Sequence, residues 1–172
     1  MLLPFKKRRS RDLELWYAEH GPALLAYARS FGLSHCVAED LIHRVFLKLL
    51  EKPWDIEEVR PYLFRAVRNS ALNEHRETKR EVELSEQEPW FETRCVSREA
   101  ELDLRFALRE LPPEQREVMI MHVWGGLTFM EIGSVLATSP NTVAARYRYA
   151  LNALRRRLQP AREVGTHEKP ER

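Results

Sequence analysis

The sequence predicts an all-α protein made of two small helical domains joined by a flexible linker. Three observations lead to this prediction. Apolar residues recur at helical spacing along most of the chain, and nowhere does the alternation of a strand persist. That periodicity is lost between residues 79 and 98, where acidic residues dominate. The net charge of +2 hides a basic–acidic–basic layout, which favours two nucleic-acid-facing parts separated by a segment that phosphate would repel.

The first domain is expected at residues 12–78, after a basic arm at residues 1–11 that has five positive charges and no acid. A first helix is predicted from about Asp12 to Phe31, with a break or kink at His20–Pro22. A second helix follows from Ser34 to about Lys52, and a third from Pro61 to about Thr78. Three helices over about 70 residues can form a small core. In the third helix we expect three residues to face inward: Leu63, Val67 and Ala71.

The linker at residues 79–98 leads to a second domain at residues 99–158, and a disordered tail is expected at 159–172. Fully extended, the linker would span roughly 66–72 Å, enough to hold the two domains on separate stretches of one duplex. Trp90 and Phe91 interrupt its polar character. They would serve either as a docking anchor or as packing against a neighbouring domain.

Within the second domain, residues 128–148 predict two short helices that meet at a tight corner. Thr128 is placed to cap the first of them, with Glu131 completing a capping box. Ser139 can cap the second, and Pro140 then occupies N1, where its missing N–H costs nothing. A second helix of this kind fits the major groove of DNA. The corner would be locked by three apolar residues: Ile132, Leu136 and Val143.

A plain helical hairpin inside a core is the alternative for this segment. Such a hairpin requires neither the capping pattern nor the charge. From Thr128 to Arg162 the chain has six basic residues against one acid, Glu131, which favours DNA binding.

Several other classes of protein are disfavoured. Cys36 and Cys95 are too few and too far apart for a disulfide framework or a ligand cluster, and no apolar run approaches membrane-spanning length. We therefore expect a cytoplasmic protein with reduced thiols. No metal-ligand spacing, nucleophile elbow or phosphate-binding loop occurs, so neither an enzyme nor a metal or cofactor is indicated.

Three motifs, in this order, resemble the extracytoplasmic-function (ECF) sigma factors of bacterial RNA polymerase. Residues Ala38–Leu47 resemble the conserved helix of sigma region 2. Residues Tyr62–Asn69 resemble the promoter-melting helix of that region. Residues Leu111–Arg116 and the helix-turn-helix after them resemble sigma region 4. The resemblance implies a three-helix region 2 and a helix-turn-helix region 4, without catalytic activity or cofactor. It also implies that the protein binds the clamp helices and flap of core RNA polymerase, recognises promoters and opens the DNA strands. A nucleoid-associated location and a possible anti-sigma factor are implied as well.

The resemblance also assigns roles to individual residues. Contacts with core polymerase fall on the second helix, at Asp40, His43, Arg44, Phe46 and Leu47. Recognition and melting of the −10 element fall on the third helix and the loop before it, at Trp54, Tyr62, Arg65, Arg68, Asn69, Asn73 and Arg76. Reading of the −35 element falls on the second domain, at Arg116, Asn141, Thr142, Ala145, Arg146 and Tyr149.

Several positions depart from the family pattern. His43 and Arg44 stand where Gln and Glu are usual, which reverses a local charge in the clamp contact. Tyr62 replaces a common Trp and Asn73 a common Asp. In the recognition helix, Ala144 and Tyr149 stand where the family often has Lys and Arg, so a different promoter preference is expected. The main rival is a stand-alone regulator that binds DNA as a dimer, which would leave the first three helices and the linker without a role.

Overall fold

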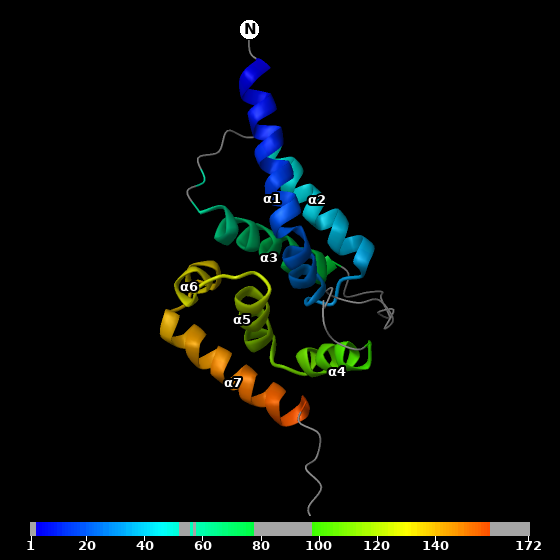
Figure 1. Cartoon of the computed structure of the whole chain (residues 1–172), viewed down its shortest axis with the longest axis vertical. Helices are drawn as coiled ribbons and strands as arrows, with labels where there is room; N and C mark the ends of the chain where they lie inside the picture. The colour runs from blue at the N-terminus through cyan, green and yellow to red at the C-terminus, as the bar shows by residue number, and fades with distance from the viewer. Residues whose placement is uncertain (1–2, 52–55, 57, 78–97, 159–172) are drawn as a thin grey trace, which may run out of the picture.

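The computed structural model describes residues 3–51, 56, 58–77 and 98–158. These residues form helices and connecting turns, without a strand among them, so the predicted all-α class is confirmed (Figure 1). The helices are α1 (Leu3–Arg29), α2 (His35–Glu51), α3 (Val59–Glu77), α4 (Arg98–Arg109), α5 (Pro113–Val123), α6 (Phe129–Leu136) and α7 (Pro140–Leu158). None of the helices described is long and apolar enough to cross a membrane.

Helix α1 differs most from the prediction. It starts at Leu3, so most of the expected basic arm belongs to the helix, and it runs through Pro22 without the expected break. A proline inside a helix costs about 3 kcal/mol because it removes a hydrogen bond and crowds the preceding turn. Beyond Pro22, Leu24, Tyr27 and Ala28 are completely buried. Packing of this turn against the rest of the molecule outweighs the local cost.

Helices α2 and α3 lie within two residues of their predicted bounds. The Ser34 hydroxyl accepts a hydrogen bond from the backbone N–H of Val37 at 3.4 Å, as expected for a residue that starts a helix. Leu63, Val67 and Ala71 are all fully buried, which confirms the predicted inner face of α3. Packed against α1, these two helices complete the first half of the molecule.

The predicted caps of the helix-turn-helix are present. Thr128 Oγ1 accepts from the N–H of Glu131 at 3.2 Å, while the Glu131 carboxylate accepts from the N–H of Thr128 at 2.6 Å. Ser139 Oγ accepts from the N–H of Thr142 at 3.1 Å. Ile132 and Val143 are fully buried at the corner. The sequence therefore located both helix starts correctly, and the helices α6 and α7 meet as predicted.

The two halves of the molecule pack together through one continuous hydrophobic core. Helix α3 lies against α6, and α1 lies against α5 (Figure 1). The largest cluster of buried side chains includes Tyr27 and Phe64 from the first half and Met121 and Ile132 from the second. In the described structure the helical parts are thus associated. Trp54, Trp90 and Phe91, the acidic linker through residue 97 and the tail from residue 159 lie outside the described residues.

Candidate polymerase and nucleic-acid interfaces

Helix α2 has an inner and an outer face. Leu41, Val45 and Leu49 are buried against α1 and α3. The opposite face exposes four of the residues predicted to contact a partner: Asp40, His43, Arg44 and Leu47. Leu47 is 56% exposed, which leaves a large apolar side chain in solvent beside charged and polar neighbours. This combination is typical of a protein interaction surface.

The outer face of α2 borders an apolar groove between α1 and α2, with a volume of about 570 Å³. The Tyr17 hydroxyl and His43 Nε2 are hydrogen-bonded at 3.1 Å, and the two rings stack with centroids 5.7 Å apart. Tyr17 is 40% exposed. The groove is lined by Leu13, Glu14, Tyr17, His43, Phe46, Leu47 and Leu50.

Two residues predicted at the polymerase contact also serve the fold. Phe46, predicted to contact core polymerase, is only 8% exposed and packs edge-on against Tyr17, with ring centroids 5.2 Å apart. It forms the floor of the groove because the side of α2 that it shares with Ile42 is buried. Arg44 makes an ion pair with Glu74 of α3 at 2.8 Å. Arg44, which stands where the family usually has Glu, thus joins α2 to α3 through this ion pair.

The melting-helix residues divide into two groups. Tyr62, Asn69 and Asn73 are exposed on α3, and Tyr62 is 42% exposed. They remain free to meet a nucleic-acid strand. Arg76 belongs to α3, but its side chain lies outside the described residues.

Arg65 and Arg68 form the second group, because their guanidinium groups contact the C-terminal half of the molecule. Arg65 Nη2 donates to the backbone oxygen of Ser134 at 3.0 Å and to its hydroxyl at 2.7 Å. Arg68 Nε donates to Glu117 Oε2 at 2.7 Å. Arg65 is nevertheless exposed, whereas Arg68 is half-buried in the described structure. Their acceptors are supplied by α5 and α6.

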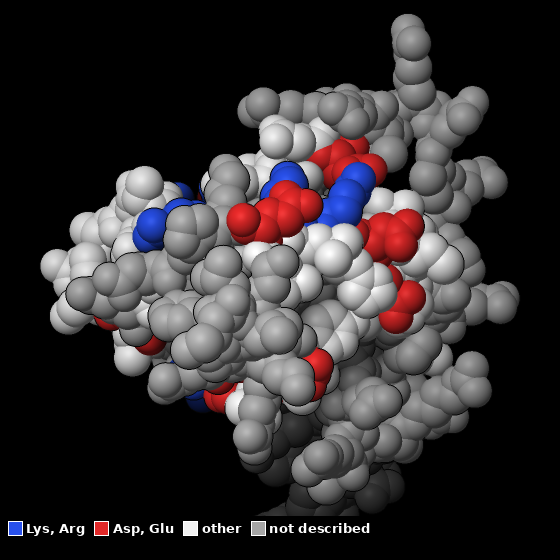
Figure 2. Space-filling view, turned by 90° about the horizontal axis from the view of Figure 1, so that it is seen from above, with Lys and Arg blue, Asp and Glu red and all other residues white. Residues whose placement is uncertain are grey.

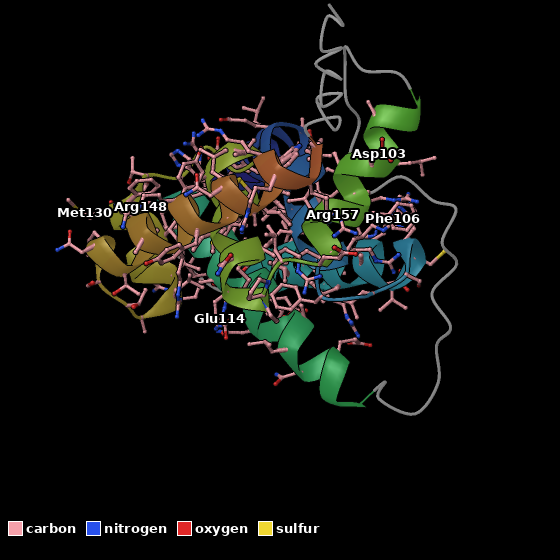
Figure 3. All side chains as sticks on the ribbon, turned by 90° about the horizontal axis from the view of Figure 1, so that it is seen from below. Asp103, Phe106, Glu114, Met130, Arg148 and Arg157 are labelled. Carbon is pink, nitrogen blue, oxygen red and sulfur yellow. The ribbon has the colours of Figure 1, made fainter. Side chains whose placement is uncertain are left out.

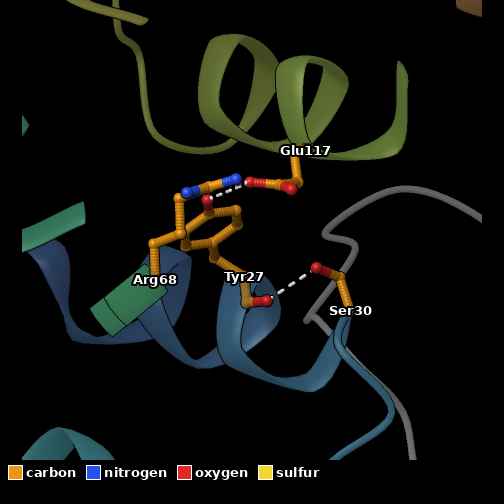
Figure 4. A network of polar contacts seen from close by, with 4 residues as sticks. All are labelled: Tyr27, Ser30, Arg68 and Glu117. Carbon is orange, nitrogen blue, oxygen red and sulfur yellow. Dashed lines mark hydrogen bonds and ion pairs between the residues drawn. The ribbon is translucent and has the colours of Figure 1, made fainter. Parts of the chain in front are cut away.

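Glu117 is the centre of a polar cluster buried between the two halves (Figure 4). The same oxygen, Oε2, also accepts from the Tyr27 hydroxyl at 2.7 Å. Burial, together with the Glu117 carboxylate, raises the pKa of Tyr27 well above its usual value. Burial lowers the pKa of Arg68, but Glu117 more than reverses this, so the pKa of Arg68 is raised. The cluster thus consists of the Arg68–Glu117 ion pair and the Tyr27 hydroxyl, which donates a hydrogen bond to Glu117.

Glu117 was missed in the sequence. It lies on α5 between Arg116 and Val118, and a single acid in a helix does not indicate a partner. Its contacts with Tyr27 and Arg68 join positions 90 and 49 residues away along the chain. Only the packing of α5 against α1 and α3 brings these groups together.

Helix α7 presents most of the predicted reading surface. Asn141, Thr142 and Tyr149 are exposed, and Ala145 and Arg146 are half-buried. Val143, Ala150 and Leu154 are buried on the opposite side. Exposed polar side chains therefore lie on the N-terminal turns, which are the turns that enter the groove in helix-turn-helix proteins. Figure 3 shows Arg148 on α7 near Met130 of α6, both at the helix-turn-helix end.

Two further arginines of this half, Arg116 and Arg157, have contacts within the protein. Arg116 Nη1 donates to the backbone oxygen of Arg109 at 3.3 Å, and burial lowers the pKa of Arg116. Arg157, labelled near the end of α7 in Figure 3, pairs with Glu110 in the turn that follows α4. Seen from above, acidic and basic side chains of the described surface are intermixed and form no patch of one sign (Figure 2). In the described part of the chain no group of three or more His, Cys, Asp or Glu is placed to hold a metal ion.

Comparison with known proteins agrees with this arrangement. The family described as Sigma-70 region 2 matches residues 16–81, and Sigma-70, region 4 matches residues 101–154. Together these matches cover more than half of the chain. The ECF RNA polymerase sigma factor SigL of Mycobacterium tuberculosis is 29% identical over 153 residues, covering 83% of this chain and 86% of the relative.

Two solved structures are also similar. The sigma factor RpoE from Bartonella quintana, in complex with the anti-sigma factor NepR, has a TM-score of 0.69 and 25% identity, covering 88% of this chain and 99% of RpoE. CnrH in complex with the cytosolic domain of CnrY has a TM-score of 0.64 at 24% identity, covering 87% of this chain and 88% of CnrH, and shows the same fold.

These matches and the helix-turn-helix define a transcription initiation factor of the sigma-70 class. The chain belongs to the ECF sigma factors of that family. It binds core RNA polymerase, directs it to specific promoters and promotes strand opening, as the motif resemblance implied. A stand-alone dimeric regulator is not favoured, since region 2 is matched as well as the helix-turn-helix.

Proposed function

We propose that the outer face of α2 and the adjoining groove bind the clamp helices of core polymerase. The supporting observation is the exposed Leu47, beside Asp40 and His43, at the rim of an apolar groove of about 570 Å³. A partner helix could bury apolar side chains in such a groove while polar groups at the rim fix its register. Tyr17, whose hydroxyl bonds to His43, belongs to this proposed surface. Phe46 supports the surface from below.

We propose that α3 contacts the strand opened at the −10 element. Tyr62 offers an exposed aromatic ring on which a base can stack, and Asn69 and Asn73 offer hydrogen-bonding groups on the same helix. Arg65 and Arg68 supply cations for the strand backbone once they are released from Ser134 and Glu117. Arg76 and Trp54 belong to this surface by the same resemblance.

We propose that the first turns of α7 read the −35 element. Asn141, Thr142 and Arg146 can reach base edges or adjacent phosphates, and Ala145 and Tyr149 extend the same surface. Arg116 lies on the preceding helix α5, where a contact with the DNA backbone would add to affinity more than to specificity. The substituted positions Ala144 and Tyr149 would then set this protein's promoter preference.

The remaining roles follow from the proposed surfaces. The protein would supply binding surfaces and leave nucleotide chemistry to the polymerase, acting in the cytoplasm on nucleoid DNA. An anti-sigma partner is supported by RpoE and CnrH, which were solved with NepR and CnrY.

Transcription in vitro tests the assignment of α2. Purified core polymerase is mixed with the protein and a promoter library, and specific initiation is scored by sequencing the transcripts. We expect Leu47→Glu to weaken binding to core polymerase at least about tenfold, because a charge replaces an apolar side chain at the contact. The matched control is Leu15→Glu, which changes a leucine that is 59% exposed on α1 and does not line the groove. Equal loss in both variants, or none in Leu47→Glu, would overturn the assignment.

A further inference from the structure

His122 lies in the last turn of α5 and contacts both helices of the helix-turn-helix. Its ring centroid is 4.8 Å from that of Phe129, the first residue of α6, and 4.8 Å from that of Tyr147 in the middle of α7. Phe129 and Tyr147 also meet each other, with ring centroids 5.5 Å apart. These three side chains, here called the ring cluster, therefore join α5, α6 and α7 at one point.

A hydrogen bond joins the same histidine to the turn between α5 and α6. His122 Nδ1 is 2.8 Å from the backbone oxygen of Leu127. Because a carbonyl oxygen can only accept, Nδ1 carries a proton and is the donor. Leu127 is 1% exposed, and the residue after it, Thr128, caps α6. The bond thus fixes the point at which the chain enters α6.

The ring cluster differs in kind from the other buried contacts of α7. Burial of Val143, Ala150 and Leu154 stabilises α7 against its neighbours, but apolar burial has no preferred direction. Pairs of rings prefer edge-on or offset arrangements. The rings of His122 and Tyr147 meet edge-on, with an angle of 77° between their planes. The ring cluster is therefore the contact suited to set the rotation of α7 about its own axis.

The rotation of α7 decides which of its side chains reach the bases. Arg146 and Arg148 are the neighbours of Tyr147 in the chain, so a rotation at Tyr147 carries both with it. Side-chain tips lie about 5–6 Å from a helix axis, so a rotation of about 10° moves them by about 1 Å. Hydrogen bonds to base edges tolerate about half that, since N–H···O distances range over about 2.7–3.2 Å. A loosened α7 would lose base readout before it loses its attraction to phosphates.

We propose that His122 is a positioning residue for promoter selection, which sets the orientation in which α7 presents its reading side chains to the −35 element. This proposal rests on the proposed function of α7 as the helix that reads that element. His122 is half-buried and acts through Phe129, Tyr147 and the backbone of Leu127. Promoter preference then depends on the packing beneath α7 as well as on the residues at its surface.

Binding to two promoter fragments tests the proposal. Core polymerase reconstituted with the full-length protein is titrated onto a fragment with the −35 element selected from a promoter library, and onto one with that element scrambled, at one fixed ionic strength. The measured quantity is the discrimination, which is the ratio of the two affinities. We expect His122→Ala to lower the discrimination about tenfold and to change the affinity for the scrambled fragment less than about twofold. His122→Phe keeps a ring without the donor to Leu127, so its discrimination should lie between those of His122→Ala and the wild type.

Val123→Ala is the matched control. Val123 is the next residue of α5, is 52% exposed and is not a member of the ring cluster, so this variant should discriminate like the wild type. Wild-type discrimination by His122→Ala would overturn the proposal. An equal fall in affinity for both fragments would also overturn it, because a general loss of folded protein lowers both affinities alike.

Tyr147→Leu decides the question if His122→Ala loses its helical circular dichroism. This variant keeps an apolar side chain on the buried side of α7 and removes the ring that meets His122. Lower discrimination with unchanged affinity for the scrambled fragment supports the proposal. Wild-type discrimination by Tyr147→Leu would overturn it.

Arg146→Ala and Asn141→Ala distinguish this failure from failure of the proposed function. Lower discrimination by either variant, together with wild-type discrimination by His122→Ala, would overturn the positioning role of His122 alone. Wild-type discrimination by both variants would mean that α7 does not read the −35 element. That result would overturn the proposed function of α7 and the role of His122 with it.

Discussion

Replacing Gly125 by alanine provides a sharp test of the packed contact between the two halves. Gly125 lies in the turn between α5 and α6, and its φ is not in the left-handed region, so a side chain is excluded by space and not by backbone conformation. An added Cβ would lie 2.5 Å from the backbone oxygen of Met121, 2.6 Å from Phe64 Cζ and 2.9 Å from Leu127 Cδ1. All three distances are shorter than atoms can tolerate, so the neighbours must move.

The expected cost follows from what has to move. Overpacking a tight site typically costs about 1–3 kcal/mol. The oxygen of Met121 also accepts a hydrogen bond from Leu127 N at 3.1 Å, and its displacement would weaken a bond with a net value of about 0.5–1.5 kcal/mol. We therefore expect Gly125→Ala to lower the free energy of unfolding by roughly 2–4 kcal/mol.

Urea denaturation followed by circular dichroism measures this change. Because the main cluster of buried side chains includes both halves, the wild type should unfold in one transition. Gly21→Ala is the control, since its added Cβ would meet only Tyr17 ring atoms at 3.8 and 3.9 Å, which is ordinary contact. A loss below about 0.5 kcal/mol in Gly125→Ala would refute the close packing of Phe64 on this turn.

Three further changes have defined outcomes. Thr128→Ala removes the cap of α6 and should lower the free energy of unfolding by about 1 kcal/mol, whereas Thr128→Ser should have little effect; equal melting curves for both would contradict the capping role. Hydrogen bonding from the backbone and side chain of Thr128 lowers the pKa of Glu131 below its usual 4.5, against the opposing effect of burial. The unfolded chain therefore binds the proton first, and this stabilising contribution should be lost as the pH falls below about 4.5. Glu131→Gln should flatten that part of the stability–pH curve, and an unchanged slope would exclude the contribution. Arg146→Ala should weaken binding of the polymerase complex to its selected −35 element by about 1–3 kcal/mol if Arg146 reads a base, and an equal loss on every sequence would mean a phosphate contact.

Local signals predicted much of the fold. Each helix of the helix-turn-helix starts where a capping residue precedes an apolar repeat, and the bonds at Thr128 and Ser139 are those that the sequence implied. The inner face of α3 followed from its apolar spacing in the same way. These features depend on residues within one or two turns of each other, so sequence spacing determines them.

The contacts between the two halves could not be predicted from the spacing of residues in the sequence. Pro22 was expected to break or kink the first helix, but the burial of Tyr27 and Leu24 depends on elements far along the chain. Arg68 was predicted to contact the −10 element, and its bond to Glu117 could not be foreseen because that residue is 49 positions away along the chain. The groove that Tyr17 lines is formed by residues of both α1 and α2, so it depends on how these two helices pack. Tertiary packing decides each of these positions.

The central claim is that the two halves of the free protein pack together through one hydrophobic core. The distance between these halves, measured in the free protein and on the polymerase, tests it most directly. Spin labels are placed at Leu15→Cys on α1 and Met130→Cys on α6, which are 59% and 75% exposed, with Cys36 and Cys95 changed to serine. Pulsed electron paramagnetic resonance should give one narrow, short distance distribution for the free protein. On addition of core polymerase, we expect the distribution to lengthen by tens of ångströms as the halves separate toward the spacing of the promoter elements. The same short distribution in both states would contradict a closed free form that opens on the polymerase.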